Sequence, residues 1–266
     1  MSLSISGKTA IVTGGANGIG LAIGRHFANN GANVMFADMD EEKLADELGD
    51  PKEGDSIRYF AGDLREKLTL ANLIAATIDA FETVDILVNA SRQVVTSEPL
   101  NPDDDGVELL LQQNLMTSLR LSQLVAKRMI KQSEGQDEGP FGSIINLSSI
   151  AARRTHPDLL AYSVSTAALD QMTRSLAVAL APHQVRVNAL SFGSVMSSSL
   201  KEALKENRDS RENIEANTPL GRIASPTELS EAAQYLASDS SSFMTGQIIT
   251  LDGGRSLVDP VTVPAH

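Results

Sequence analysis

Short β-rich apolar segments alternate with longer amphipathic segments along the whole chain, and this alternation limits the possible folds more than any other feature. Strand followed by helix, repeated throughout, is typical of βαβ units and therefore of a parallel sheet. We predict one doubly wound, parallel α/β domain over residues 1–266. The predicted strands span residues 9–12, 33–37, 57–61, 86–88, 143–147, 185–190 and 247–251.

Six helices are predicted from apolar residues that recur at helical spacing. They span residues 19–29, 41–48, 68–81, 107–130, 162–180 and 227–236. Two polar segments are predicted to be loops, at 132–140 and 193–217. The second follows a predicted strand at the edge of the sheet where ligands bind in such folds. We expect it to be a substrate lid, with an ordinary helical insertion as the alternative.

The composition argues against several classes of function. The chain has no cysteine, and its formal net charge is -12. The lack of cysteine rules out disulfides and thiolate metal sites, and an acidic chain is repelled by nucleic acids and anionic membranes. The four histidines lack the spacing of metal ligands, so no metal is expected. With no signal-like or membrane-spanning apolar run, we expect a cytoplasmic protein.

A glycine-rich segment joins the first predicted strand to the first predicted helix. It runs Thr13-Gly-Gly-Ala-Asn-Gly-Ile-Gly20. Glycines at such a turn let backbone N–H groups approach a diphosphate at the helix N-terminus. Asp38 ends the second predicted strand, where a carboxylate accepts hydrogen bonds from the adenine ribose. The combination predicts a Rossmann-type dinucleotide site with a preference for NAD(H), although Asp38 alone could also be a helix N-cap.

The T-G-x-x-x-G-x-G spacing resembles that of the short-chain dehydrogenase/reductase family, and further motifs resemble this family in the same order. They are Asp63-Leu64, Asp85–Asn89, Asn114, Asn146–Ser149, Tyr162, Pro219–Arg222, Gly246-Gln247 and Leu251–Gly254. The resemblance implies an oxidoreductase that interconverts an alcohol and a carbonyl compound, and a homodimer or homotetramer. The cofactor-binding positions that it implies are Gly14, Asn17, Gly18, Ile19, Gly20, Asp38, Asp63, Leu64, Asn89, Ala90, Tyr162, Thr166, Gly193 and Val195.

The same resemblance implies a catalytic set of Asn114, Ser149, Tyr162 and the residue at position 166. In the family, the tyrosine phenol is the acid, the serine holds the substrate oxygen and the asparagine helps to position a water of the proton relay. A lysine four residues after the tyrosine lies on the same helical face. A cation at that place lowers the pKa of a tyrosine phenol. Here the segment is Tyr162-Ser-Val-Ser-Thr166, so threonine replaces this lysine.

Two other departures surround the same site. Arg92 stands where the family usually has a glycine close to the cofactor, and Phe192 replaces a proline after the sixth strand. One interpretation is an oxidoreductase that uses another cation, with Arg153 and Arg154 as candidates. The alternative is an NAD-binding pseudoenzyme with a structural or regulatory role. The retained tyrosine and serine favour the enzyme.

Overall fold

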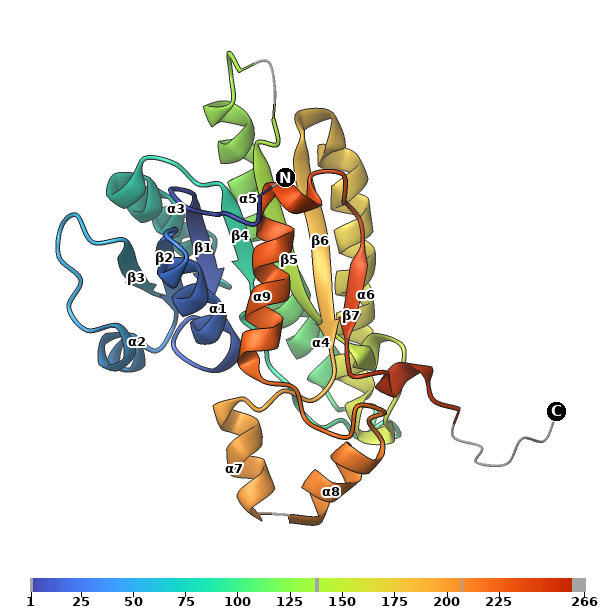
Figure 1. Ribbon diagram of the computed structural model, residues 1–266. Helices are drawn as coiled ribbons and strands as arrows, with labels where there is room; N and C mark the ends of the chain where they lie inside the picture. The colour runs from blue at the N-terminus through green and yellow to red at the C-terminus, as the bar shows by residue number, and fades with distance from the viewer. Residues whose placement is uncertain (1, 137–138, 207, 260–266) are drawn as a thin grey trace.

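Seven parallel strands form one central sheet, which confirms the predicted doubly wound α/β class. The computed structural model describes residues 2–136, 139–206 and 208–259. The strand order is β3-β2-β1-β4-β5-β6-β7 (Figure 1). The strands are β1 (Thr9–Thr13), β2 (Asn33–Asp38), β3 (Ile57–Ala61), β4 (Ile86–Asn89), β5 (Gly142–Ser149), β6 (Val185–Phe192) and β7 (Ile248–Leu251).

Helices cover both faces of the sheet because alternate strand residues are apolar on both sides. One buried cluster joins Val12 and Phe36 to α1 (Gly18–Asn29), α2 (Glu41–Leu48) and α9 (Pro226–Ala237). A second joins Ile11 and Leu87 to α3 (Lys67–Phe81), α5 (Thr117–Gln132) and α6 (Leu160–Leu180). Figure 1 shows α1 and α9 in front of the sheet, with α5 and α6 behind it.

The strand order reverses between β1 and β4, which pair in parallel with Val12 opposite Val88. At such a switch point the loops leave the two carboxyl ends in opposite directions and open a crevice. Thr13 and Asn89 end the two strands at this crevice. The fold therefore brings the glycine turn after β1 next to the segment after β4.

The prediction of a loop over 193–217 was wrong, because two helices fill most of it. They are α7 (Ser198–Glu206) and α8 (Arg208–Ala216), which lie together below the sheet in Figure 1. The serines suggested a loop, but Ser197 begins the helix: its Oγ accepts a bond from Leu200 N–H at 3.3 Å. The helical alternative is thus correct for the secondary structure, while the role of the segment as a lid stays a prediction.

The predicted helix at 107–130 has an unpredicted interruption. It consists of α4 (Gly106–Leu110), a π-helical segment (Leu111–Met116) and α5. A π-turn inserts one extra residue into the helix and is frequent at functional sites. Here the turn contains Asn114, whose side chain is held by the chain after β4, as described below.

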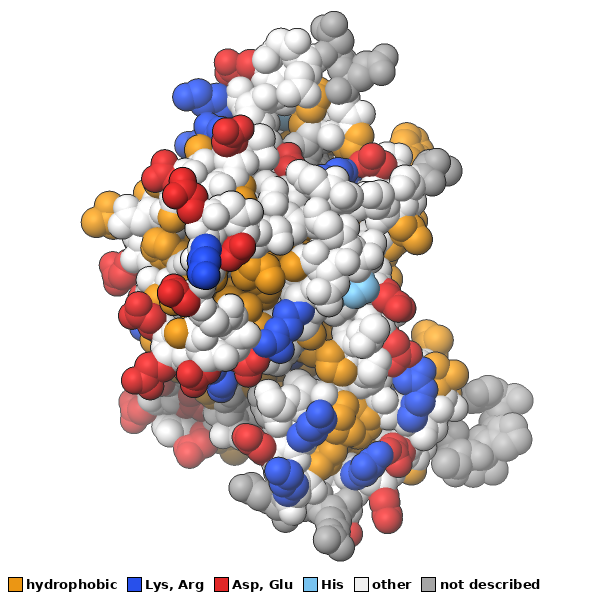
Figure 2. Space-filling view, turned by 60° about the vertical axis from the view of Figure 1, so that its left-hand side comes forward, with side chains coloured by type: hydrophobic (Ala, Val, Ile, Leu, Met, Phe, Trp, Pro, Cys, Tyr) orange, Lys and Arg blue, Asp and Glu red, His pale blue; other side chains and the backbone are white. Residues whose placement is uncertain are grey.

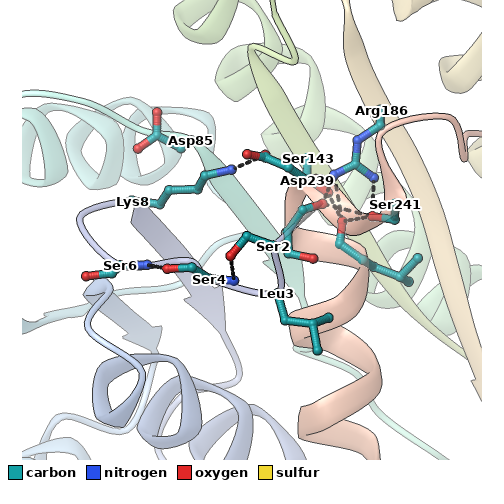
Figure 3. A network of polar contacts seen from close by, with 12 residues as sticks. Ser2, Leu3, Ser4, Ser6, Lys8, Asp85, Ser143, Arg186, Asp239 and Ser241 are labelled. Carbon is teal, nitrogen blue, oxygen red and sulfur yellow. Dashed lines mark hydrogen bonds and ion pairs between the residues drawn. The ribbon is translucent and has the colours of Figure 1, made fainter.

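A network of polar contacts lies at the amino-terminal end of the strands, opposite the crevice (Figure 3). The buried Arg186 on β6 donates to Ser241 Oγ at 2.9 Å and to the Leu236 carbonyl at 2.8 Å. Lys8 pairs with Asp239 at 2.7 Å. These bonds satisfy carbonyls at the end of α9 and anchor this helix, so Arg186 has a structural role far from the crevice.

Candidate active site

The turn after β1 is tight because two of its glycines lie where a side chain would not fit. Gly14 has a φ of +65°, and a Cβ there would lie 2.9 Å from the Ala90 carbonyl oxygen. A Cβ on Gly20 would overlap the carbonyl of Gly14. No side chain caps the first turn of α1, since Asn17 makes no capping bond. The N–H groups at the start of α1 are therefore available to an anion.

Thr13 joins the two loops that meet at the crevice. Its hydroxyl oxygen accepts bonds from the N–H groups of Ala90 and Ser91, both at 3.0 Å. This bridge fixes the segment after β4 against the glycine turn. We did not predict a role for Thr13, although the threonine before Gly14 was part of the motif itself.

Asp38 lies beside the glycine turn, as expected. Ala16 N–H donates to Asp38 Oδ2 at 3.1 Å, while Oδ1 accepts from Met39 N–H at 2.8 Å and from Asp40 N–H at 3.3 Å. The N-cap of α2 is Asp40, which accepts from Lys43 N–H at 3.0 Å. Asp38 is thus not the helix cap, and its carboxylate is oriented by the turn.

A cavity of about 470 Å³ runs along this crevice. It is lined by nine of the predicted cofactor positions: Gly14, Asn17, Gly18, Ile19, Gly20, Asp38, Asp63, Leu64 and Ala90. Ser91, Arg92, Gln93, Val94 and Gln113 also line it, and none of these five was predicted as a cofactor position. The cavity thus extends from the carboxylate of Asp38 to the segment after β4.

Asp63 has a charged partner at the rim of the cavity. Arg65 pairs with it at 2.6 Å and donates further bonds to both of its carboxylate oxygens. The hydrogen bonds from Arg65 lower the pKa of Asp63 below its ordinary value. The carboxylate is therefore kept ionised while its outer face remains partly exposed.

Five predicted cofactor positions are not among the residues that line this cavity: Tyr162 and Thr166, which are described below, and Asn89, Gly193 and Val195. The amide of Asn89 is buried and donates to Ser122 Oγ at 3.0 Å and to Asn146 Oδ1 at 2.8 Å. Gly193 N–H donates to the Leu251 carbonyl at 3.2 Å, and Val195 forms a bridge with Ala224. Asn89 thus links β4 to β5, and the other two shape the chain after β6.

Tyr162 is 5% exposed, and its phenol oxygen contacts a cation. Arg92 Nη1 donates to Tyr162 Oη at 2.8 Å. The guanidinium carbon of Arg92 also lies 4.4 Å from the centre of the Phe192 ring, which is cation–π distance. Arg92 therefore contacts both Phe192, the other departure from the family pattern, and the predicted catalytic acid.

Asn114 fixes the residue next to Arg92. Gln93 N–H donates to Asn114 Oδ1 at 2.8 Å, and Asn114 Nδ2 donates to the Gln93 carbonyl at 2.9 Å. The side chain of Asn114 is 4% exposed. This two-way bond holds the backbone after β4, and the π-turn places the amide where it can form it.

The hydroxyls of Ser149 and Thr166 differ in whether their proton is already used in a hydrogen bond. Ser149 Oγ accepts from Ala151 N–H at 3.1 Å, so its own proton remains available to another acceptor. Ser149 ends β5 and pairs in register with Phe192 at the end of β6. Thr166 is 3% exposed, and its hydroxyl donates to the Tyr162 carbonyl at 2.8 Å within its own helix.

Arg153 and Arg154, the two cations that the sequence offered in place of the lysine, have surroundings different from those of Arg92. Arg154 Nε donates to the Ser256 carbonyl at 3.0 Å and so ties the C-terminal segment to the molecule. Arg153 is exposed on the same turn and lies close enough to the buried Asp170 to lower its pKa, although burial, the larger effect, raises it. Among the described residues, the guanidinium bonded to the phenol of Tyr162 is that of Arg92.

A second groove of about 620 Å³ lies between α7 and α8. Figure 2 shows basic side chains around an apolar patch at this lower end of the molecule. The groove is lined by Met196, Lys201, Leu204, Lys205, Arg211 and Glu212. Met196 therefore lies in a groove whose rim is charged.

Within residues 2–136, 139–206 and 208–259, no group of three or more acidic or histidine side chains is arranged to hold a metal ion. No helix in the described part of the chain has the length and apolar character needed to cross a membrane.

Comparison with known proteins finds relatives along nearly the whole chain. The family model described as enoyl-(acyl carrier protein) reductase matches residues 14–256. Oxidoreductase UcpA of Salmonella typhimurium is 33% identical, over 97% of this chain and 98% of its own. L-fucose dehydrogenase of Mus musculus is also 33% identical, over 95% of this chain and 89% of its own.

A solved structure agrees with the architecture as well. A short-chain dehydrogenase/reductase of unknown function from Caenorhabditis elegans, solved with cofactor, superimposes with a TM-score of 0.84 at 28% identity. The match covers 97% of this chain and 98% of the other. Fold, motif order and site geometry therefore all point to one family.

Proposed function

Because the chain belongs to the short-chain dehydrogenase/reductase family, whose relatives here are oxidoreductases, we propose that it is an NAD-dependent enzyme that interconverts an alcohol and a carbonyl compound. The observation that carries the proposal is the cavity at the β1–β4 switch point. Its lining includes the uncapped start of α1 and the oriented carboxylate of Asp38.

The residues present fit a dinucleotide. The N–H groups at the start of α1 would receive the diphosphate, since a helix N-terminus attracts anions. Gly14 and Gly20 leave no side chain in the way. Asp63 and Leu64 would flank the adenine end of the cavity. Bound NADH would supply the hydride, which the protein side chains themselves cannot provide.

NAD(H) is preferred over NADP(H) in this proposal because of charge. Asp38 would accept hydrogen bonds from the ribose hydroxyls, whereas a 2′-phosphate would be repelled by its carboxylate. The neighbouring residues of the turn, Ala16 and Asn17, carry no cation that could offset this repulsion.

Tyr162 and Ser149 would act on the substrate oxygen. The Ser149 hydroxyl can donate to a carbonyl oxygen because it already accepts from Ala151 N–H. Tyr162 would give its phenolic proton to the alkoxide that develops during reduction, which is general acid catalysis. Asn114 acts as a positioning residue through the backbone of Gln93.

The proposal also includes a homodimer or homotetramer in the cytoplasm, with α7 and α8 as a substrate lid. Exposed apolar side chains support self-association: Phe243, Leu257 and Val178 are largely accessible to solvent, as at many oligomer interfaces. Sedimentation of the purified protein would test the oligomeric state. A monomer at micromolar concentration would contradict this part of the proposal.

The experiment that tests the central proposal is a pair of titrations with NADH and NADPH, followed by a panel of alcohols, ketones and sugars. The sugars are included because L-fucose dehydrogenase is a relative. We expect tighter binding of NADH and turnover of at least one compound in the panel. Binding without any turnover would favour the pseudoenzyme, and no binding of either dinucleotide would refute both.

Asp38→Asn is the critical variant and Asp40→Asn its matched control. Removing the Asp38 charge should reduce the NADH preference about tenfold, the size expected for one partly screened charge–charge contact. The Asp40 variant retains the N-cap acceptor of α2 and should keep the wild-type preference. An unchanged preference in Asp38→Asn would refute the charge argument.

A further inference from the structure

We propose that Arg92 supplies the cation that Tyr162 needs, in place of the lysine that position 166 lacks. The inference rests on the proposed alcohol–carbonyl chemistry and identifies a catalytic residue of that site. In the sequence, Arg92 is a departure from the family pattern, because it puts a large side chain where the family has a glycine close to the cofactor. In this proposal, the same side chain has a catalytic role.

The hydrogen bond has the polarity that an acid catalyst requires. A guanidinium has only donors and stays charged at all working pH values. At 2.8 Å from Tyr162 Oη, Arg92 Nη1 must donate, so the phenol oxygen accepts. The phenolic hydrogen is then not used in this bond and can be given to a substrate oxygen.

One contact holds the guanidinium and another holds the backbone beside it. The Phe192 ring lies 4.4 Å from the guanidinium, and Asn114 bonds both the N–H and the carbonyl of Gln93, the next residue along the chain. An arginine with no role would extend into water, because its charge is costly to desolvate. Here the cation instead lies between an aromatic ring and a buried phenol.

Thr166 has no comparable access to the phenol oxygen. Its hydroxyl donates to the carbonyls of Tyr162 and Ser163, at 2.8 and 3.2 Å. The chain therefore carries two changes with respect to the family pattern, a lost cation at 166 and a gained cation at 92. Arg92 contacts the atom that the missing lysine would serve.

The proton balance closes with bound NADH as the reductant and water as the final proton donor. In the proposed reduction, bound NADH would supply the hydride for the new C–H bond at the carbonyl carbon, and the carbonyl oxygen would receive the proton of Tyr162 Oη. The O–H bond of the phenol breaks and that of the alcohol forms. The phenolate is stabilised by the charge of Arg92 until it takes a proton from water.

The primary test measures the phenolate directly in cofactor-free protein, so it does not depend on turnover. The chain has three tyrosines, and Tyr162→Phe provides the blank for an ultraviolet titration of tyrosinate. We expect Arg92→Gln to reduce the phenolate absorbance assigned to Tyr162 at a fixed alkaline pH, because a charge-assisted bond to the phenol oxygen is lost. Arg92→Lys should retain most of it.

Arg153→Gln and Arg154→Gln are the matched controls, since they remove the same charge from the neighbouring turn. Both should leave the titration of Tyr162 unchanged. A fall in either control but not in Arg92→Gln would overturn the proposal, as would an unchanged titration in Arg92→Gln. If Arg92→Gln does not fold, as judged by circular dichroism, Arg92→Met takes its place under the same criteria.

The double variant Arg92→Gly/Thr166→Lys places the cation where the family has it. We expect it to recover the phenolate fraction that Arg92→Gly alone loses. Where a substrate is known, the pH profile of kcat should shift to higher pH in Arg92→Gln and return in the double variant. Faster turnover in Arg92→Gln at every pH would identify Arg92 as an obstruction and overturn the proposal.

Discussion

The close approach of Gly14 to Ala90 gives a quantitative prediction for Gly14→Ala. The φ of +65° costs an L-residue about 1–2 kcal/mol. Alanine recovers about 0.4–1 kcal/mol because it restricts the unfolded chain. The new Cβ would lie 2.9 Å from the Ala90 carbonyl oxygen, a backbone atom that cannot rotate away. Overpacking of this kind costs about 1–3 kcal/mol.

The sum is a loss of about 1–5 kcal/mol in the free energy of unfolding, with a middle value of about 3 kcal/mol. For a chain of this size, the middle value lowers the melting temperature by roughly 6–12 °C. Gly221→Ala is the matched control, because Gly221 has a φ of +64° with no atom within 4 Å of the added Cβ. It should lose only about 0–1.6 kcal/mol, with a middle value of about 0.8 kcal/mol, which is the strain less the entropic gain.

Thermal melts with and without NADH measure both consequences. Moving Ala90 also displaces the turn that would bind the diphosphate, so Gly14→Ala should weaken NADH binding roughly tenfold, the cost of one charged hydrogen bond. Gly221→Ala should retain wild-type affinity. Equal destabilisation of the two variants would refute the argument from the Ala90 contact, whatever the effect on binding.

Two ionisable groups give predictions about pH. Burial raises the pKa of Asp170 above its ordinary value, so the folded state loses stability as the pH rises from the ordinary pKa to the raised one. Asp170→Asn should therefore melt at a higher temperature than the wild type at neutral pH, and a lower melting temperature would contradict this. Arg222 lowers the pKa of Glu228 from 4.5 to about 2, so this pair stabilises the fold above about pH 4.5 and the contribution is lost as the pH falls towards 2. In the Glu228→Gln variant, the free energy of unfolding should therefore fall less between pH 4.5 and about pH 2 than in the wild type, as measured by unfolding titrations at several pH values. The same fall in both proteins would contradict the role of this pair.

The sequence was sufficient to predict the sheet because its signal is local. Each strand is a short apolar run bounded by turn residues, so all seven were identified and the structure changes only their ends by a few residues. The glycine turn and Asp38 were found for the same reason, since their spacing along the chain is part of the motif.

Features that depend on distant contacts were not predictable in this way. The helices α7 and α8 have few apolar residues, and their serine-rich start resembled a loop. The π-turn at Leu111–Met116 accompanies the capture of the Gln93 backbone by Asn114, a contact across 21 positions. Helical periodicity does not contain this information.

Arg92 shows why the departures from a family motif have to be interpreted together. Taken one at a time against the pattern that the resemblance implies, threonine at position 166 would remove a cation and arginine at position 92 would add bulk, and both would argue against catalysis. The contact between Arg92 and Tyr162 spans 70 positions, so no local pattern could connect the two changes. A lost active-site lysine would leave a 5% exposed phenol without a charged partner, whereas a relocated cation leaves the phenol oxygen with a charged donor. The second description, which is our proposal, accounts for both departures and for the aromatic ring of Phe192 that lies against the guanidinium; the titration of the Arg92→Gln variant decides between the two descriptions.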